Sequence, residues 1–210
     1  MEREAVKKLF GKNFIGKDEL KPFFKSLGFG NVDLQEKPIQ YSDASIQKAA
    51  SEGYILIYGV GSINGQNITL KFLRERFGVN PDESEPCLYN QDWYMNENFM
   101  DLTLEDRWYL IKKDVYEESR AVMPDDLTQQ GLNFPSAILC GYTFFTYYFA
   151  RDEYLWWHDF VWCCDMDHNG DRIYVGKYND IDGVNKNGFS IHRHLALRPC
   201  YGSVNVYTSC

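Results

Sequence analysis

Long apolar runs are missing from this sequence. Residues 1–10, MEREAVKKLF, are charged and lack the apolar core of a secretory signal. No later run stays free of polar residues over a length that could span a bilayer. We therefore expect no membrane insertion and a protein that is cytoplasmic as synthesised, with virion association or display by another route left open.

Basic residues are also scarce. Lysine and arginine number 22 against 30 aspartates and glutamates, which leaves a formal net charge of -8. Proteins bind phosphate backbones through clustered basic side chains that release counterions. Because no long basic run offsets the negative charge, nucleic acid is excluded as the expected partner.

Without an export signal, the six cysteines favour free thiols over a disulfide framework. Cys140 lies in an apolar run and is expected in the core, and the adjacent Cys163 and Cys164 would face opposite sides of a strand. The full set is Cys87, Cys140, Cys163, Cys164, Cys200 and Cys210. We expect no obligatory transition metal and no cofactor, with calcium left open.

With 210 residues, 44% of them hydrophobic and 16% aromatic, the chain can bury one sizeable core. No internal repeat or clear boundary divides it, so we expect a single domain over residues 1–210. Residues 1–155 would form a mainly helical scaffold half and residues 156–210 a β-rich half that binds a ligand. Helical spacing and capping residues predict helices at residues 18–27, 42–52, 69–77 and 136–150.

Alternation and turn signals predict the strands. Buried strands are expected at residues 54–58 and 108–111, and a polar loop at residues 124–133. After Phe160, Asn-Gly and Asp-Gly pairs separate expected strands at residues 160–162, 172–178 and 189–197. In the middle one, Ile173 and Val175 would point inward and Tyr174 to the other face. The predicted fold class is α+β, with helices packed on a twisted antiparallel sheet.

Aromatic and histidine side chains are concentrated near the C-terminus. All four histidines and three of the five tryptophans lie after residue 155. Such side chains supply contact area and hydrogen bonds at low rotamer cost, which is typical of recognition surfaces. We expect an outward ligand-binding face made of Trp157, Tyr174, Tyr178, Asn179, Asp180, Asn185, Asn187, His192, Arg193, His194 and Tyr201.

An aspartate-rich turn resembles the first half of a calcium loop. Asp165, Asp167, Asn169 and Asp171 alternate around Gly170, so their oxygens could turn toward one ion. The second half of the loop fails, because the twelfth position is Gly176 rather than a bidentate glutamate. The alternative is an Asx-type turn in which the carboxylates accept hydrogen bonds from backbone N–H groups.

His192 and His194 are two residues apart, so on a strand both would project from one face. With a third ligand such as His158, His168 or a cysteine they could hold zinc. The alternative is that both imidazoles are binding groups at the surface, or that one is a hydrogen-bonded residue under a loop.

The segment from Trp156 to Cys200 resembles the C-terminal half of C-type-lectin-like domains of the formylglycine-generating-enzyme type. The matching residues are Arg172-Ile173-Tyr174-Val175-Gly176 and Leu195-Ala196-Leu197-Arg198-Pro199. The order of aspartate-rich turn, Arg-x-x-Val-Gly, Asp-x-x-Gly and closing strand is similar also to variable proteins of diversity-generating retroelements. This resemblance implies a C-type-lectin-like fold that displays exchangeable ligand-binding residues. Cys200 lacks the partner cysteine of the enzymes, which argues against an oxidase.

Three classes of function compete. A non-enzymatic protein that recognises a protein or cell-surface ligand is favoured by the outward face. The first alternative is a metal- or thiol-dependent enzyme related to formylglycine-generating enzymes, and a pocket holding the histidines and a thiol together would favour it. The second is a structural component of a viral or other assembly. In a retroelement-diversified binder, the outward residues between Tyr174 and Tyr201 would be exposed and exchangeable, while the scaffold would be Ile173, Val175, Gly176, Gly183 and Leu197.

Overall fold

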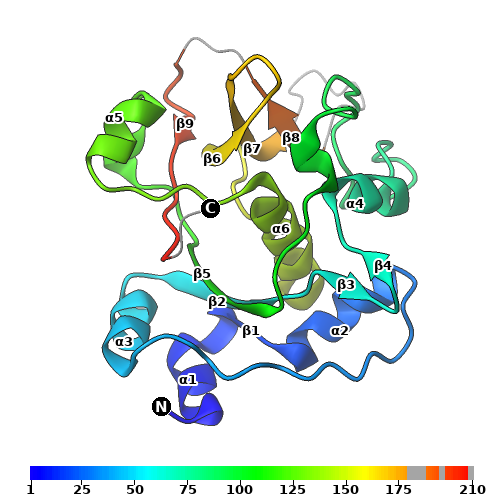
Figure 1. The fold of residues 1–210 in the computed structure, drawn as a ribbon, viewed down its shortest axis with the longest axis vertical. Helices are drawn as coiled ribbons and strands as arrows, with labels where there is room; N and C mark the ends of the chain where they lie inside the picture. The colour runs from blue at the N-terminus through cyan, green and yellow to red at the C-terminus, as the bar shows by residue number, and fades with distance from the viewer. Residues whose placement is uncertain (179–187, 194–196, 208–210) are drawn as a thin grey trace.

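A computed structural model describes residues 1–178, 188–193 and 197–207, with Tyr178 described by its backbone. Two separate sheets lie on either side of one central helix, α6 (Ala137–Arg151) (Figure 1). The chain therefore has the mixed α+β class that its sequence predicts.

The N-terminal sheet has the order β1-β2-β5. Its central strand β2 (Tyr54–Gly59) is buried at every position. It pairs in parallel with β1 (Phe14–Ile15) and antiparallel with β5 (Arg107–Lys112). Helices α1 (Arg3–Phe10) and α3 (Asp43–Ser51) contact β2, and α2 (Lys17–Ser26) contacts β1 and α6.

Helix α6 is buried from Ala137 to Tyr147 on all of its sides. Ser136 caps it, because the Ser136 hydroxyl accepts a hydrogen bond from the Leu139 backbone N–H at 3.2 Å. The helix contacts both sheets through β2, β6 and β7, and it also contacts α2 and α4. Helix α6 therefore forms the centre of the core.

The C-terminal sheet has the order β8-β7-β6-β9. Strands β6 (Phe160–Met166), β7 (Arg172–Tyr178) and β8 (Gly188–His192) form an antiparallel meander. The short β9 (Tyr201–Gly202) adds in parallel to β6. Beyond it, the chain returns to the first sheet, where Val206 bridges to Ile111 of β5.

Residues 60–106, which connect β2 to β5, contain little regular secondary structure but contribute many side chains to the core. A hairpin of β3 (Ser62–Ile63) and β4 (Gln66–Asn67) leads into α4 (Leu70–Phe77), whose cap Thr69 accepts from the Phe72 N–H at 3.0 Å. Within the described residues, short 3-10 helices span Gly11–Asn13, Asn98–Asp101 and Glu117–Ser119. The main hydrophobic cluster runs from Val6 to Val206, so both halves of the chain share it.

Some expectations about the fold were wrong. The strands do not form one antiparallel sheet, because α6 is apolar on all sides and each sheet packs against it separately. Two of the strand pairs, β1-β2 and β6-β9, are parallel. The predicted polar loop at residues 124–133 contains a short helix, α5 (Pro124–Gln129), which has proline at its first turn and acidic residues after it.

The helices predicted at residues 18–27, 42–52, 69–77 and 136–150 are confirmed within two residues as α2, α3, α4 and α6. The strand predicted at residues 160–162 continues to Met166, and the one predicted at 189–197 ends at His192. None of the helices in the described part of the chain is both long enough and apolar enough to pass through a bilayer.

Candidate ligand-binding site

A row of aromatic side chains crosses the C-terminal sheet on one face, and the strand register places it there. Trp162 of β6 lies opposite Tyr174 of β7, and Tyr174 lies opposite His192 of β8. On the other edge, Phe160 of β6 lies beside Tyr201 of β9. Because residues directly opposite each other project from the same face, four strands contribute to one aromatic row.

The other face of the same strands belongs to the main core. Val161, Ile173, Val175 and Ile191 are all fully buried there. The inward direction predicted for Ile173 and Val175 is therefore confirmed. Gly176 allows the close approach of β7 to the start of β6, since a Cβ at this position would lie 2.0 Å from the Asp159 carbonyl oxygen.

The aromatic row is partly covered by its own small hydrophobic cluster. Leu127 of α5 and Phe134 pack with Phe160, Trp162, Tyr174 and Tyr201. The part left uncovered forms a cavity of about 310 Å³, here called the aromatic pocket. It is lined by Tyr89, Phe160, Tyr174, His192, Arg198, Cys200 and Tyr201.

His192 is held by rings on two sides. Its imidazole stacks on Tyr174 with centroids 5.4 Å apart and an interplanar angle of 18°. It meets the Phe160 ring edge to face at 5.3 Å and 83°. Burial lowers the pKa of His192 to about 4, so the ring is neutral at pH 7. Its Nε2 atom is buried and has no hydrogen-bond partner among the described residues.

Besides His192, the polar residues that line the aromatic pocket are three tyrosines, one arginine and one cysteine. The hydroxyls of Tyr174 and Tyr201 hydrogen-bond to each other, and burial raises the pKa of both. The exposed Arg198 side chain forms no ion pair with any described residue. The pocket therefore combines an aromatic wall, an unpartnered imidazole nitrogen and one positive charge at its edge.

The pocket brings one histidine and one thiol together, which is a feature expected of the enzyme alternative. Burial, however, raises the pKa of Cys200, while burial alone lowers that of His192. A thiolate–imidazolium pair would shift both pKa values the other way. The described cysteines Cys87 and Cys163 are also buried, and burial raises the pKa of each thiol, to about 12 for Cys87.

The residues predicted to bind a ligand fall into different environments. Trp157 is 47% exposed, as expected. Tyr174 and Tyr201 are buried, at 2% and 5% exposure, so the prediction that they are freely exposed was wrong. The reason is that α5 and Phe134 cover the outward face of the sheet. Six of the predicted side chains lie outside what the structure describes: Tyr178, Asn179, Asp180, Asn185, Asn187 and His194.

Arg193 is anchored in the protein rather than free for a ligand. Its guanidinium pairs with Asp167 at 2.5 Å and lies 4.4 Å above the Trp93 ring. Glu97 lies 3.9 Å from the same guanidinium group and also contacts His168. Glu97, Asp167 and His168 have the spacing of metal ligands, but Arg193 already supplies a positive charge at this point.

The aspartate-rich turn is engaged by the protein itself. Asp165 accepts a hydrogen bond from the Ala137 N–H at the start of α6. Asp167 accepts from the N–H groups of Asn169 at 2.9 Å and Asp171 at 2.8 Å. Although desolvation opposes it, these hydrogen bonds and Arg193 lower the pKa of Asp167 to about 2. The Asx-turn interpretation is therefore confirmed, and Asp165 and Asp167 point to different partners.

The zinc hypothesis and the thiol prediction have separate outcomes. His192 is enclosed by aromatic rings, and His194 lies outside the described residues. Cys87, Cys140, Cys163 and Cys200 are free thiols, as predicted. Cys164 is disulfide-bonded, so the prediction was wrong for this residue. Cys163 belongs to the main core, whereas Cys164 packs against the aromatic cluster on the other face of β6.

The ligand-binding residues predicted from the sequence did not include four that line the aromatic pocket: Tyr89, Phe160, Arg198 and Cys200. The signal for Phe160 was present, because it has the same parity as Trp162 in β6 and so shares its face. Tyr89 comes from an irregular segment, where its N–H donates to the Phe189 carbonyl at 2.9 Å. No periodic pattern could have placed it.

No family model, curated protein or solved structure matches this chain. Its function therefore has to be inferred from its own geometry.

Proposed function

We propose that this protein is a non-enzymatic recognition protein whose aromatic pocket binds a ring-bearing ligand, such as a side chain of a partner protein or a cell-surface molecule. One observation carries this proposal. The buried Nε2 of His192 has no partner, and it sits in a cavity walled by aromatic rings. A buried polar group without a partner costs free energy, which a ligand that hydrogen-bonds to it would recover.

The chemistry of the lining sets the ligand class. Phe160, Tyr174 and Tyr201 offer apolar ring surface, with centroids 5.0 to 5.6 Å apart. Neutral His192 can form one hydrogen bond to the ligand. Arg198 at the edge favours a negative charge. The best match is a planar ring that carries a hydrogen-bonding group and an acidic group.

A small probe tests the proposal. We would titrate the protein with 4-hydroxyphenylacetate and follow the imidazole signals of the histidines by NMR. The expected result is saturable binding that shifts the His192 signals. Because His192→Ala removes one hydrogen bond and one ring contact, it should weaken binding by about tenfold.

The matched control is His158→Asn. His158 is exposed and does not line the aromatic pocket, and asparagine tolerates its positive φ of 61°. This variant should bind the probe as the wild type does. Equal binding by His192→Ala and wild type, with both folded by thermal unfolding, would contradict the proposal.

The enzyme alternative is favoured by one feature, the presence of His192 and Cys200 in the same pocket. It predicts a reactive thiolate. Our proposal predicts instead that iodoacetamide modifies Cys200 at pH 7 more slowly than it modifies glutathione, because burial raises the pKa of Cys200. Peptide mapping after alkylation distinguishes the two. The assembly alternative predicts a large complex rather than a monodisperse monomer in light scattering.

The C-type-lectin-like fold and the retroelement origin remain proposals based on resemblance. The β6-β7-β8 meander and the return of the C-terminal segment to β5 support the fold. Because Tyr174 and Tyr201 are packed, the exchangeable positions would have to lie elsewhere in the C-terminal quarter. A near-copy of the 3′ coding sequence that differs mainly at adenines, beside a reverse transcriptase gene, is the observation that tests the origin.

A further inference from the structure

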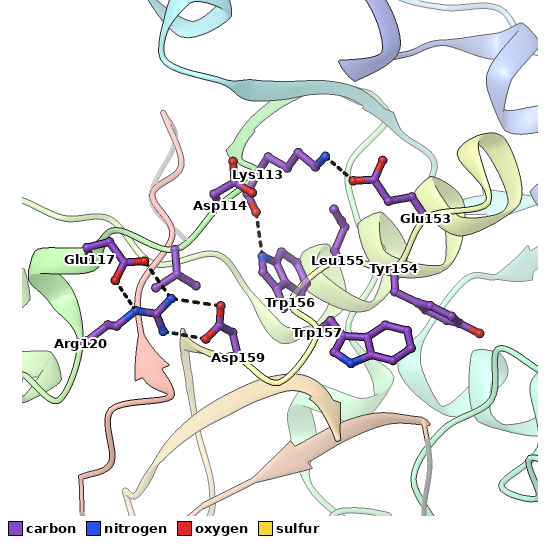
Figure 2. A pocket seen from close by; sticks show the side chains of 11 residues that line it. Lys113, Asp114, Glu117, Arg120, Glu153, Tyr154, Leu155, Trp156, Trp157 and Asp159 are labelled. Atoms are coloured by element: carbon purple, nitrogen blue, oxygen red, sulfur yellow. Dashed lines mark hydrogen bonds and ion pairs between the residues drawn. The ribbon is translucent and has the colours of Figure 1, made fainter. Parts of the chain in front are cut away.

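A second cavity of about 320 Å³ lies between the loop after β5 and the segment that joins α6 to β6 (Figure 2). It is here called the Trp157 pocket. It is separate from the aromatic pocket, since the two share no lining residue. Nothing in the proposed function uses it.

The wall of the Trp157 pocket is aromatic. Trp157 is 47% exposed, and its ring meets Tyr154 at 5.3 Å and 65°. Trp156 is buried behind it, where its indole N–H donates to the Lys113 carbonyl at 3.1 Å. Figure 2 shows the rings of Tyr154, Trp156 and Trp157 among the side chains that line the cavity. An exposed indole beside a cavity is a surface available to a ligand.

The backbone holds Trp157 outward at a cost. Trp156 and His158 both have positive φ, at 50° and 61°. Lys177 of β7 secures this conformation: its N–H donates to the Trp156 carbonyl at 3.1 Å, and its carbonyl accepts from the His158 N–H at 3.3 Å. The position of the exposed ring is therefore determined by the sheet rather than by a free loop.

The opposite side of the pocket is acidic and only partly neutralised. Arg120 is shared between Glu117 and Asp159, with its Nη1 atom 2.6 Å from Asp159 and its Nε atom 2.8 Å from Glu117 (Figure 2). One positive charge thus serves two carboxylates. Asp114 is exposed and forms no ion pair or side-chain hydrogen bond with any described residue.

The fourth carboxylate of the lining, Glu153, is the best compensated. It pairs with Lys113 at 2.5 Å and with Lys12 at 3.1 Å. Lys12 does not line the pocket. The negative charge that remains for a ligand therefore lies near Asp114, Glu117 and Asp159.

The same rings already bind a cation from within the protein. The Lys177 ammonium lies 4.5 Å from the Tyr154 centroid and 5.5 Å from the Trp157 centroid. Lys177 is only 2% exposed and pairs with Glu85 at 3.0 Å, so it is an internal group rather than a ligand. Its presence shows that these rings are placed where a cation interacts with them favourably.

We propose that the Trp157 pocket binds an organic cation of the kind carried by lysine and arginine side chains, presented by a basic partner peptide. An exposed indole and carboxylates that are only partly neutralised are the two kinds of group that such a cation uses together. An anionic ligand would meet like charge. A metal ion would gain nothing from the indole, and the described carboxylates of this pocket do not have the spacing of metal ligands.

The test uses two probes that differ in charge. Nα-acetyl-L-arginine methylamide carries the guanidinium, and Nα-acetyl-L-citrulline methylamide is its neutral isostere. The indole N–H signals of the tryptophans are followed by NMR during titration. We expect the arginine probe to shift the Trp157 signal saturably and to bind at least about fivefold more tightly than the citrulline probe.

Variants locate the binding. Asp114→Asn and Trp157→Ala should each weaken the arginine probe by about three- to fivefold, the size expected for one exposed charge or ring contact. The matched control is Glu118→Gln, which removes an exposed carboxylate of the same loop that does not line the pocket. It should change the affinity by less than about twofold, apart from the general effect of net charge.

Two outcomes would overturn this inference. The first is equal binding of the arginine and citrulline probes, and the second is an affinity that Asp114→Asn and Trp157→Ala leave unchanged while both variants stay folded. Failure of the proposed function would be seen separately, because His192→Ala affects the aromatic pocket and should bind the arginine probe normally.

Discussion

Replacing His192 by phenylalanine should remove a pH-dependent loss of stability. His192 is enclosed by Tyr174 and Phe160, and burial lowers its pKa from 6.5 to about 4. The folded protein therefore keeps the ring neutral at a pH where the unfolded chain protonates it. Burying the neutral His192 ring therefore contributes its full stability to the folded protein above pH 6.5. This stability is lost as the pH falls from 6.5 to about 4, because the unfolded chain binds the proton first.

The structure also sets the size of the effect. The fall in the pKa of His192 from 6.5 to about 4 corresponds to at most about 3.5 kcal/mol, at roughly 1.4 kcal/mol for each pH unit. Because the ring is only partly enclosed and borders a cavity, water and the unfolded ensemble reduce this value, and we expect about 1 to 3 kcal/mol. Phenylalanine preserves the two ring contacts and does not titrate.

Urea unfolding at several pH values between 7 and 4 measures this directly. The free energy of unfolding of wild type should fall by about 1 to 3 kcal/mol more than that of His192→Phe over this range. The other titrating groups change the free energy of unfolding equally in both proteins, so their effect cancels in the difference. Parallel curves for wild type and His192→Phe would refute the reasoning, since they would mean that the imidazole titrates alike in the folded and unfolded chains.

The remaining predictions concern positions that support the sheet and its helix. Gly176→Ala should destabilise the protein by about 3 kcal/mol or more in chemical unfolding, because its Cβ would lie 2.0 Å from the Asp159 carbonyl oxygen; a stable variant would disprove this close approach. Ser136→Ala should lower the stability of α6 by about 1 kcal/mol through loss of its cap, and an unchanged unfolding midpoint would count against it. Ser119→Ala should cost about 1 to 3 kcal/mol, because it leaves the buried Ser203 N–H without the acceptor now 2.8 Å away; fast hydrogen exchange at Ser203 is the accompanying sign, and persistent protection there would contradict it.

The Trp157 pocket shows why spacing alone could not predict a site here. Arg120, Glu153 and Asp159 come from three different segments and were not singled out as ligand-binding residues. Their sequence neighbours carry no periodic pattern that points to a shared cavity. Hydrogen bonds to Lys177 of β7 hold Trp156 and His158 at positive φ. The residues around Trp156 do not indicate such a long-range contact, so the sequence could not predict this conformation.

The sequence by itself determined the local structure. Ser42 and Thr69 cap helices as their side chains predicted, because a cap needs only neighbouring N–H groups. The alternation of apolar and polar residues assigned Ile173 and Val175 to the core face, because successive side chains of a strand point to opposite faces.

Tertiary structure alone decided what lies against the other face. The sequence placed Tyr174 outward, but α5 and Phe134 cover that face and turn an expected open surface into a small apolar cluster with a pocket beside it. It also decided that the longer strands divide into a three-stranded and a four-stranded sheet on either side of α6. The position of a residue along a strand determines which face of the sheet its side chain points to. The distant segments that pack against it depend on how the whole chain buries its apolar surface.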